Sequence, residues 1–209
     1  VAELCSERLP KAYGYSPLED IQVLCPSKKG ETGTININKL LQKALNPSAK
    51  HKKEFAFGQR VFREGDKLMQ IKNNYDLEWQ KDDGSTGHGI FNGDIGFIYD
   101  MDFKNKTMEI VFDDKTVIYD FSLLEELEHA YAITVHKSQG SECPIVIIPA
   151  YRAPEMLLTR NMLYTAVTRA QNMVIIVGER EIVKTMVENN RQALRYTGLA
   201  YLFGGQNEH

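Results

Sequence analysis

The densest group of polar side chains lies at residues 134–142, directly before an apolar run. Four of these side chains can donate hydrogen bonds to phosphate oxygens, namely Thr134, His136, Lys137 and Ser138. Gly140 lets a backbone approach a ligand closely. Open α/β folds place ligands beside a sheet edge, so the segment is a candidate phosphate site. A solvated connection that caps a helix explains the segment alone equally well.

An arginine lies near the end of the second candidate segment, residues 161–170. Apolar residues recur there at helical spacing and predict a buried stripe made of Leu163, Ala166, Val167 and Ala170. Thr165 and Arg169 are four residues apart and share a face of this predicted helix. A guanidinium held on a rigid helix is suited to bind a phosphate. A contact between the arginine and the carboxyl end of its own helix is the simpler alternative.

Lysines and glycines occupy a third candidate, the loop at residues 27–34 between a predicted strand and a predicted helix. Lys28 and Lys29, with Gly30 and Gly33, could hold a phosphate near the helix N-terminus. The loop does not match the nucleotide-binding pattern GxxxxGK(S/T), which occurs nowhere in the chain. A plain strand-to-helix connection is at least as good an interpretation.

Other familiar chemistries lack the residues that they need. The five histidines show no metal-ligand spacing, and no GxSxG segment supports a serine hydrolase. His136 and Cys143 could suggest a thiol nucleophile, but Pro144 and an apolar run follow the cysteine and favour an inert core thiol. The acidic run made of Glu125, Glu126 and Glu128 is typical of a solvated face.

Composition excludes several classes of protein. The 209 residues are 43% hydrophobic and 25% charged, which is typical of a globular chain with one large domain or two small ones. The formal net charge is −3, so any phosphate contact must be local. The three cysteines form no CxxC pair and favour free thiols in a reducing cytoplasm. No apolar run is long enough for a membrane span.

Hydrophobic periodicity predicts an α/β domain that is interrupted by a β-rich insertion. Buried strands are expected at residues 21–25, 145–148 and 173–177. Helices are expected at residues 1–13, 37–45, 159–170 and 179–190, with a further helix starting within 130–139 and a loose tail at 191–209. Short β-rich runs separated by turn residues fill residues 58–121 and predict a small barrel. The α/β domain is then made of residues 1–57 and 122–209.

Two of these segments resemble motifs of one helicase family. Residues 130–142 resemble helicase motif V of the RecD-like branch of superfamily 1, the family of the exodeoxyribonuclease V alpha subunit, and residues 163–170 resemble its motif VI. The strand and loop at the start of that family's C-terminal half are similar to residues 21–26 with Lys29, Gly30 and Gly33. The SH3-like module inserted there resembles residues 65–67, 73–76 and 91–96. The resemblance runs in order through nearly the whole chain.

The resemblance implies a RecA-like (P-loop NTPase-type) second motor domain interrupted by a small SH3-like β-barrel. In that family ATP and Mg²⁺ bind between two RecA-like domains, and the first domain supplies the P-loop, the magnesium-binding acids and the catalytic base. Arg169 corresponds to the arginine finger, which stabilises charge on the leaving γ-phosphate. Gln139, Gly140 and Glu142 are expected to line the same cleft.

The resemblance also implies a grip on the backbone of single-stranded DNA, which positions the strand without reading its sequence. Thr134 and His136 are the residues that motif V assigns to this grip. The other expected DNA contacts are Lys137, Ser138, Lys28, Lys29 and Asn74. The expected partners are single-stranded DNA, the missing N-terminal RecA-like domain and further helicase–nuclease subunits. Members of this branch move 5′ to 3′ along the strand.

The departures from the family pattern concern the nucleotide. The P-loop, the magnesium acids and the other first-domain motifs are missing, and the chain opens without Met. The chain is therefore expected to be a fragment without ATPase or helicase activity of its own. A non-catalytic module that binds nucleic acid or protein, or half of an RNA helicase, stays open as an alternative. No acid cluster in these residues supports nuclease activity.

Overall fold

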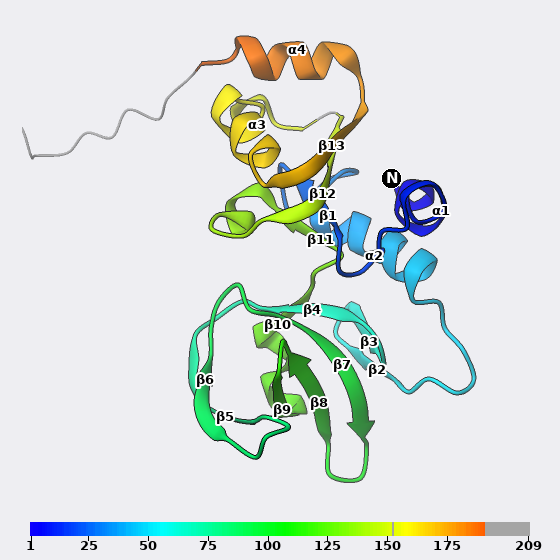
Figure 1. Cartoon of the computed structure of the whole chain (residues 1–209), viewed down its shortest axis with the longest axis vertical. Helices are drawn as coiled ribbons and strands as arrows, with labels where there is room; N and C mark the ends of the chain where they lie inside the picture. Colours follow the sequence, from blue (N-terminus) through cyan, green and yellow to red (C-terminus); the bar gives the residue numbers. More distant parts are fainter. Residues whose placement is uncertain (152, 191–209) are drawn as a thin grey trace, which may run out of the picture.

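The computed structural model describes residues 1–151 and 153–190 and divides them into an α/β part and a β-rich part (Figure 1). The α/β part contains both the beginning and the end of the described chain, and the β-rich part lies below it in this view. The expected tail at 191–209 lies outside the described residues. The chain thus enters the β-rich part from the α/β part and returns to it.

Four parallel strands form the sheet of the α/β part, in the order β11-β1-β12-β13. These strands are β11 (Ala132–Thr134), β1 (Ile21–Cys25), β12 (Cys143–Ala150) and β13 (Ala170–Gly178). Strand β1 is buried along its whole length, and β12 is buried from Ile145 onward. Such continuous apolar runs are typical of parallel strands that are covered on both faces.

Helices cover the two faces of this sheet. A short π-helix (Leu4–Arg8), α1 (Leu9–Tyr13) and α2 (Thr34–Leu45) pack on one face, and α3 (Arg160–Val167) and α4 (Arg180–Glu188) pack on the other. Alternate residues of β12 serve the two cores, because Ile145 and Ile147 face α2 while Val146 and Ile148 face α3. Two 3₁₀ turns, Val135–Ser138 and Glu155–Leu157, complete the connections of this part.

The β-rich part contains a seven-stranded antiparallel sheet in the order β10-β4-β7-β8-β9-β5-β6, beside the hairpin β2-β3. The strands are β2 (Glu54–Phe57), β3 (Arg60–Arg63), β4 (Lys67–Gln70), β5 (Asn74–Gln80), β6 (Thr86–Ile90), β7 (Ile95–Asp102), β8 (Thr107–Phe112), β9 (Lys115–Asp120) and β10 (Leu127–His129). A 3₁₀ helix at Phe121–Glu126 links β9 to β10. Strands β2 and β10 belong to this part although both lie outside residues 58–121, the range expected for the inserted module.

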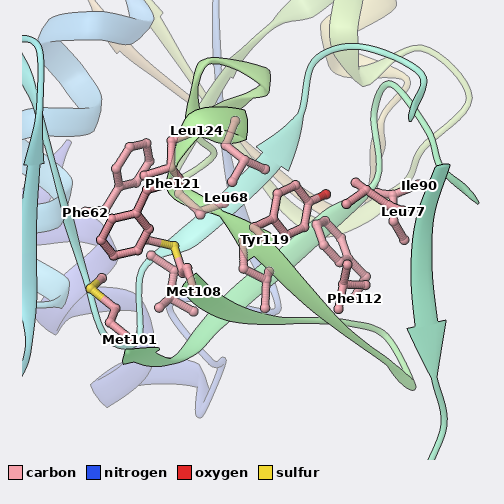
Figure 2. Close-up of a cluster of buried hydrophobic side chains, with 14 residues drawn as sticks. Phe62, Leu68, Leu77, Ile90, Met101, Met108, Phe112, Tyr119, Phe121 and Leu124 are labelled. Atoms are coloured by element: carbon pink, nitrogen blue, oxygen red, sulfur yellow. The ribbon is translucent and has the colours of Figure 1, made fainter. Parts of the chain in front are cut away.

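A separate hydrophobic core fills the β-rich part (Figure 2). Every second residue of β8 is buried, so Met108 and Phe112 point into the core beside Tyr119. Phe62 of the hairpin lies at one end of this core, Leu77 and Ile90 lie at the other end, and Leu124 of the 3₁₀ helix lies between them. The two parts therefore each bury apolar side chains of their own.

A buried carboxylate joins the two parts. Asp66 is fully buried and accepts hydrogen bonds from Gln42 Nε2 of α2 at 2.6 Å and from Tyr131 Oη beside β11 at 2.8 Å. Asn46 Nδ2 and the backbone N–H of Arg63 also donate to it, each at 2.8 Å. A buried charge requires such donors, because it has lost its hydration. The network fixes the point at which the chain leaves the α/β part.

Two expected helices differ from the structure. The segment 130–139 holds strand β11 and one 3₁₀ turn instead of the start of an α-helix, because Ala132–Thr134 pair with β1. Helix α3 ends at Val167, whose side chain is 38% exposed rather than part of the buried stripe. Ala170 already begins β13, which is an edge strand and is only partly buried where a fully buried strand was expected.

Candidate functional site

The candidate residues lie at opposite edges of the parallel sheet. Lys28 follows β1 and Thr134 ends β11, so both lie at the carboxyl edge. Glu142 precedes β12 and Arg169 precedes β13, so both lie at the amino edge. The segment 134–142, which the sequence presents as one polar cluster, therefore crosses from one edge to the other. Open α/β sheets bind ligands outside their carboxyl ends, so the amino-edge residues fall outside that rule.

Arg169 lies in the turn between α3 and β13, not on the helix itself. Its guanidinium is half-buried and contacts three neutral oxygens, each at 3.3 Å: the carbonyls of Thr165 and Ser141 and the hydroxyl of Thr168. Cys143 N donates to its backbone carbonyl at 2.9 Å and fixes the turn against β12. None of the ion pairs found among residues 1–151 and 153–190 involves Arg169. Its positive charge is therefore available to an anion.

The loop before β12 runs beside this guanidinium. Gln139, Gly140 and Ser141 are exposed, and Glu142 accepts a hydrogen bond from Gln171 Nε2 at 3.3 Å. Gly140 has a φ of +87°, in the left-handed region where a side chain would be strained. The structure thus brings the loop that contains Gly140 next to Arg169, through the carbonyl of Ser141.

Lys67 is a second cation on this side of the sheet and was not a candidate from the sequence. It lies with Arg169, Glu142 and Cys143 in the wall of one cavity of about 460 Å³ between the sheet and the β-rich part, the Arg169 cavity. Its ammonium is buried and donates to the carbonyl of Leu18 at 2.6 Å and to Gln22 Oε1 at 3.2 Å. Burial lowers the pKa of Lys67 to about 8.

Cys143 does not behave as a nucleophile in this wall. Its sulfur donates to the carbonyl of Asp20 at 3.0 Å, and burial raises the pKa of the thiol. The thiol therefore stays protonated at neutral pH. His136 is exposed on the 3₁₀ turn, and no hydrogen bond joins it to Cys143 in the part of the chain that is described.

The carboxyl edge holds a compensated cluster of charges. Lys28 Nζ donates to the carboxylate of Glu128, and Lys137 Nζ lies 3.9 Å from the other oxygen of the same carboxylate. Burial lowers the pKa of Lys137, while Glu128 opposes that shift and Lys28 adds to it. These three side chains and Thr134 line one small cavity. Glu128 is thus half-buried between two lysines, and its interpretation as part of a solvated acidic face was wrong.

A larger groove continues from this cluster along α2. It encloses about 420 Å³, and its walls come from α2, the hairpin β2-β3 and residues 125–129. The two cavities share Lys28, Thr34, Glu128 and His129. We refer to this space as the α2 groove; its wall includes Lys28, Ile35, Lys39, Arg60, Val61 and Glu128.

The remaining candidates are dispersed. Lys29 is exposed, and its backbone lies against Gly33, where a Cβ atom would come within 2.5 Å of the Lys29 carbonyl. Ser138 is buried, and its hydroxyl donates to the carbonyl of Val135 at 2.8 Å, so it lines the Arg169 cavity instead of the lysine cluster. Asn74 lies on β5, where its amide donates to Glu126 at 3.0 Å, and it lines neither cavity.

The described residues hold neither a metal-ligand cluster nor a membrane-spanning helix. Residues 1–151 and 153–190 contain no cluster of three or more His, Cys, Asp or Glu side chains able to hold a metal ion. None of the helices in these same ranges has the length and apolar character needed to cross a bilayer.

Two family models match the chain. Residues 37–112 match the SH3 domain of ATP-dependent RecD-like DNA helicases, and residues 129–177 match the UvrD-like helicase C-terminal domain. The first match covers α2 and most of the β-rich part, and the second covers the strands on which Thr134, Glu142 and Arg169 depend.

Curated relatives from the same helicase family are similar in sequence over most of the chain. The ATP-dependent RecD2 DNA helicase of Deinococcus radiodurans is 32% identical over 173 residues, which are 83% of this chain and 22% of the relative. The RecBCD enzyme subunit RecD of Mycolicibacterium smegmatis is 30% identical over 182 residues, which are 87% of this chain and 29% of the relative. The chain therefore spans less than a third of the length of these relatives.

A solved structure supports the fold. The crystal structure of the Pif1 helicase from Bacteroides, in complex with ADP-AlF3 and single-stranded DNA, superposes with a TM-score of 0.54 at 17% sequence identity. The match covers 98% of this chain and 50% of the Pif1 chain. At this level of identity the likeness concerns the arrangement of helices and strands alone.

Proposed function

This chain belongs to the RecD-like branch of the superfamily 1 DNA helicases, and we propose that it is the C-terminal motor half of an ATP-dependent DNA helicase. Its parallel sheet is RecA-like and its β-rich part is SH3-like. The expected division at residues 57 and 122 shifts in this assignment, because β2, the 3₁₀ helix and β10 belong to the β-rich part. We assign residues 1–53 and 130–190 to the motor domain and residues 54–129 to the inserted module. The observation that carries the proposal is the guanidinium of Arg169 at the amino edge of the sheet, which contacts neutral oxygens and forms no ion pair within residues 1–151 and 153–190.

Arg169 is the arginine finger in this proposal. ATP, held with Mg²⁺ by a preceding P-loop lobe, supplies the phosphoanhydride bond whose cleavage drives the motor. The donor set suits such a group, because a guanidinium bound only to neutral oxygens can exchange those contacts for phosphate oxygens at little cost. Gln139, Gly140 and Glu142 line the same side of the cleft. Arg169 lies at the amino edge of the sheet and not at the carboxyl edge, where such sheets usually bind ligands. This position is consistent with a contact to a nucleotide that is bound by another lobe.

The carboxyl edge is the DNA grip in this proposal. Lys28, Thr134 and Lys137 lie together and offer donors to successive phosphates. His136 and Lys29 are exposed nearby and extend this surface. Ser138 and Asn74 contribute less, because both side chains already have partners inside the protein. Closing the ATP cleft moves this grip relative to that of the first lobe, with 5′-to-3′ translocation as the result.

The decisive experiment replaces Arg169 in the full-length helicase, in which the P-loop lobe is present. We expect Arg169→Ala to lower single-strand-stimulated ATP turnover by roughly 10³–10⁵-fold, with little change in ATP affinity. Arg169→Lys keeps the charge but loses the planar fork, so it restores only part of the rate. The exposed Arg180, replaced by Ala, is the matched control. Undiminished turnover in Arg169→Ala would refute the assignment.

The alternatives give different outcomes in the same assays. A non-catalytic binding module predicts DNA or protein binding that is indifferent to Arg169 and no ATP turnover in the full-length protein. Half of an RNA helicase predicts that RNA strands compete better than DNA strands of equal sequence. Residues 1–209 alone are expected to show no ATP turnover, because Arg169 then has no nucleotide to reach. Further helicase–nuclease subunits would appear as partners of the full-length protein.

A further inference from the structure

The α2 groove has the size and walls of a small-ligand site. Its volume of about 420 Å³ lies within the range of roughly 300–1,000 Å³ that is usual for such sites. Ile35 of α2 is 45% exposed and Val61 of β3 is 37% exposed, and both line the groove. These two exposed aliphatic side chains form an apolar patch for a flat group in a groove whose other lining residues are polar or charged.

Cations lie around this apolar patch. Lys28, Lys39 and Arg60 line the groove, and the acids that face them are Glu125 and Glu128. Lys72 Nζ already pairs with Glu125 at 3.2 Å, outside the groove wall. The guanidinium of Arg60 donates to the carbonyl of Leu127 and stands 5.4 Å from the ring centre of Phe62. A planar cation of this kind stacks well on a nucleobase.

Glu128 holds the place that a phosphate would take. Its carboxylate lies where the α2 groove meets the cavity of Thr134, between Lys28 and Lys137. The side chain of Lys28 is 55% exposed and that of Glu128 is 24% exposed, so the pair is open to exchange with solvent anions. A phosphate at this point must first separate Glu128 from the lysines.

We propose that the α2 groove binds one unstacked nucleotide of single-stranded DNA, with its phosphate on Lys28 and Lys137 in place of the Glu128 carboxylate and its base between Ile35 and Val61 beneath Arg60. The inference rests on the proposed function and adds a base subsite to the backbone grip. Glu128 acts as an internal competitor of the phosphate, so each nucleotide that enters or leaves the groove exchanges one ion pair for another. Ile35 and Val61 offer no hydrogen bonds to base edges, and the Asn38 and Gln42 amides of the groove wall already donate to backbone carbonyls, so the subsite favours no particular base.

The first test separates bases from phosphates. Fluorescence anisotropy compares the binding of the chain to a fluorescein-labelled oligo(dT) and to an abasic strand of the same length. We expect oligo(dT) to bind about tenfold more tightly, and Ile35→Ser and Val61→Ser to bring that ratio close to one. The control is Val187→Ser, which changes an aliphatic side chain that is 48% exposed on α4. Equal binding of the two strands by the unaltered chain would remove the base subsite.

The second test concerns the internal competitor. Glu128→Gln frees both lysines, so we expect about tenfold tighter binding of oligo(dT) and of the abasic strand alike. The slope of log K against log salt should steepen by about 0.7 for each lysine that becomes available to a phosphate. Glu7→Gln is the charge-matched control, because Glu7 pairs with Lys11 at 3.2 Å on the N-terminal helices. An affinity and a slope of Glu128→Gln equal to those of Glu7→Gln would overturn the competitor role.

The outcomes separate this inference from the motor proposal. Loss of ATP turnover in Arg169→Ala together with equal binding of both strands would leave the motor and remove the subsite. Base-dependent binding with unchanged turnover in Arg169→Ala would keep the subsite and remove the motor role of that arginine. Absence of binding to either strand by the chain, even with Glu128→Gln, would overturn the subsite. Thermal melts of all variants show whether each is folded.

Discussion

The cations at the two edges of the parallel sheet have different hydrogen-bond and ion-pair partners. At the amino edge Arg169 and Lys67 have only neutral hydrogen-bond acceptors, and neither takes part in an ion pair found in the described ranges. At the carboxyl edge Lys28 and Lys137 share the carboxylate of Glu128. Among the described residues, the cations thus form no ion pair at one edge and share one carboxylate at the other, although Glu19, Asp113 and Glu142 also line the Arg169 cavity.

This difference suits two kinds of anion. An uncompensated guanidinium gains most when an anion arrives, which fits a group that must respond strongly to the terminal phosphate of a nucleotide. Lysines that already share a carboxylate gain little when one anion replaces another. In the proposed function, such a weak preference suits a DNA strand that is released at every step. Three changes would break or sharpen this comparison.

Lys67→Met tests the lack of compensation at the amino edge. Lys67 has its pKa lowered from 10.5 to about 8, so between these pH values the unfolded chain binds more protons than the folded protein and stability rises with pH. The stability of the unaltered chain relative to Lys67→Met should therefore increase by about 2–3 kcal/mol between about pH 7 and pH 10. Urea unfolding at several pH values measures the difference. Parallel profiles would mean that an acid compensates Lys67 after all.

Ser141→Asp places a carboxylate beside Arg169, as Glu128 lies beside Lys28 and Lys137 at the carboxyl edge. The carbonyl of Ser141 already accepts a hydrogen bond from Arg169 Nη1 at 3.3 Å, so a carboxylate on this exposed residue can reach the guanidinium. We expect ATP turnover of the full-length helicase to fall by about 10–100-fold, the equivalent of one charge-assisted hydrogen bond. Ser141→Asn is the neutral control. Similar turnover in the two variants would show that the charge of Arg169 is not the quantity that matters.

Lys28→Gln should have the smallest effect. Lys137 stays beside Glu128, and the ion pair that is lost is largely exposed, so the free energy of unfolding should change by less than about 1 kcal/mol. Affinity for oligo(dT) should fall only about threefold, because Lys28 already pairs with Glu128 in the free protein and gains little when a phosphate replaces that carboxylate. Anisotropy and urea unfolding measure the two quantities. A loss of affinity as large as the loss of turnover in Arg169→Ala would erase the difference between the edges.

Sequence patterns predicted the parts of the fold that depend on local periodicity. The strand at residues 21–25 and the helix that ends before Pro47 lie where their apolar spacing and turn residues place them. The motif resemblance identified the helicase family and drew attention to Arg169. Segment 132–134 escaped prediction, because three residues carry no periodicity and become a strand only by pairing with β1.

The burial and pairing of the charged residues at the two edges could not be predicted, for a different reason. Glu128 and Lys67 look like ordinary solvated residues in the sequence, and only tertiary packing brings one between two lysines and buries the other. Burial and partner choice depend on contacts between residues far apart in the chain. The division of the segment 134–142 between two edges likewise follows from strand order, which no single segment specifies.

The chain leaves and re-enters the α/β part at neighbouring points. Asn46 follows the end of α2 and Tyr131 precedes β11, and their side chains both donate to Asp66 Oδ1 at 2.8 Å. A segment whose ends meet in this way can be lengthened, shortened or exchanged without separating the strands of the sheet that carries it. The parallel sheet can therefore stay intact while the β-rich part is exchanged, in evolution or by protein engineering, for a different inserted domain.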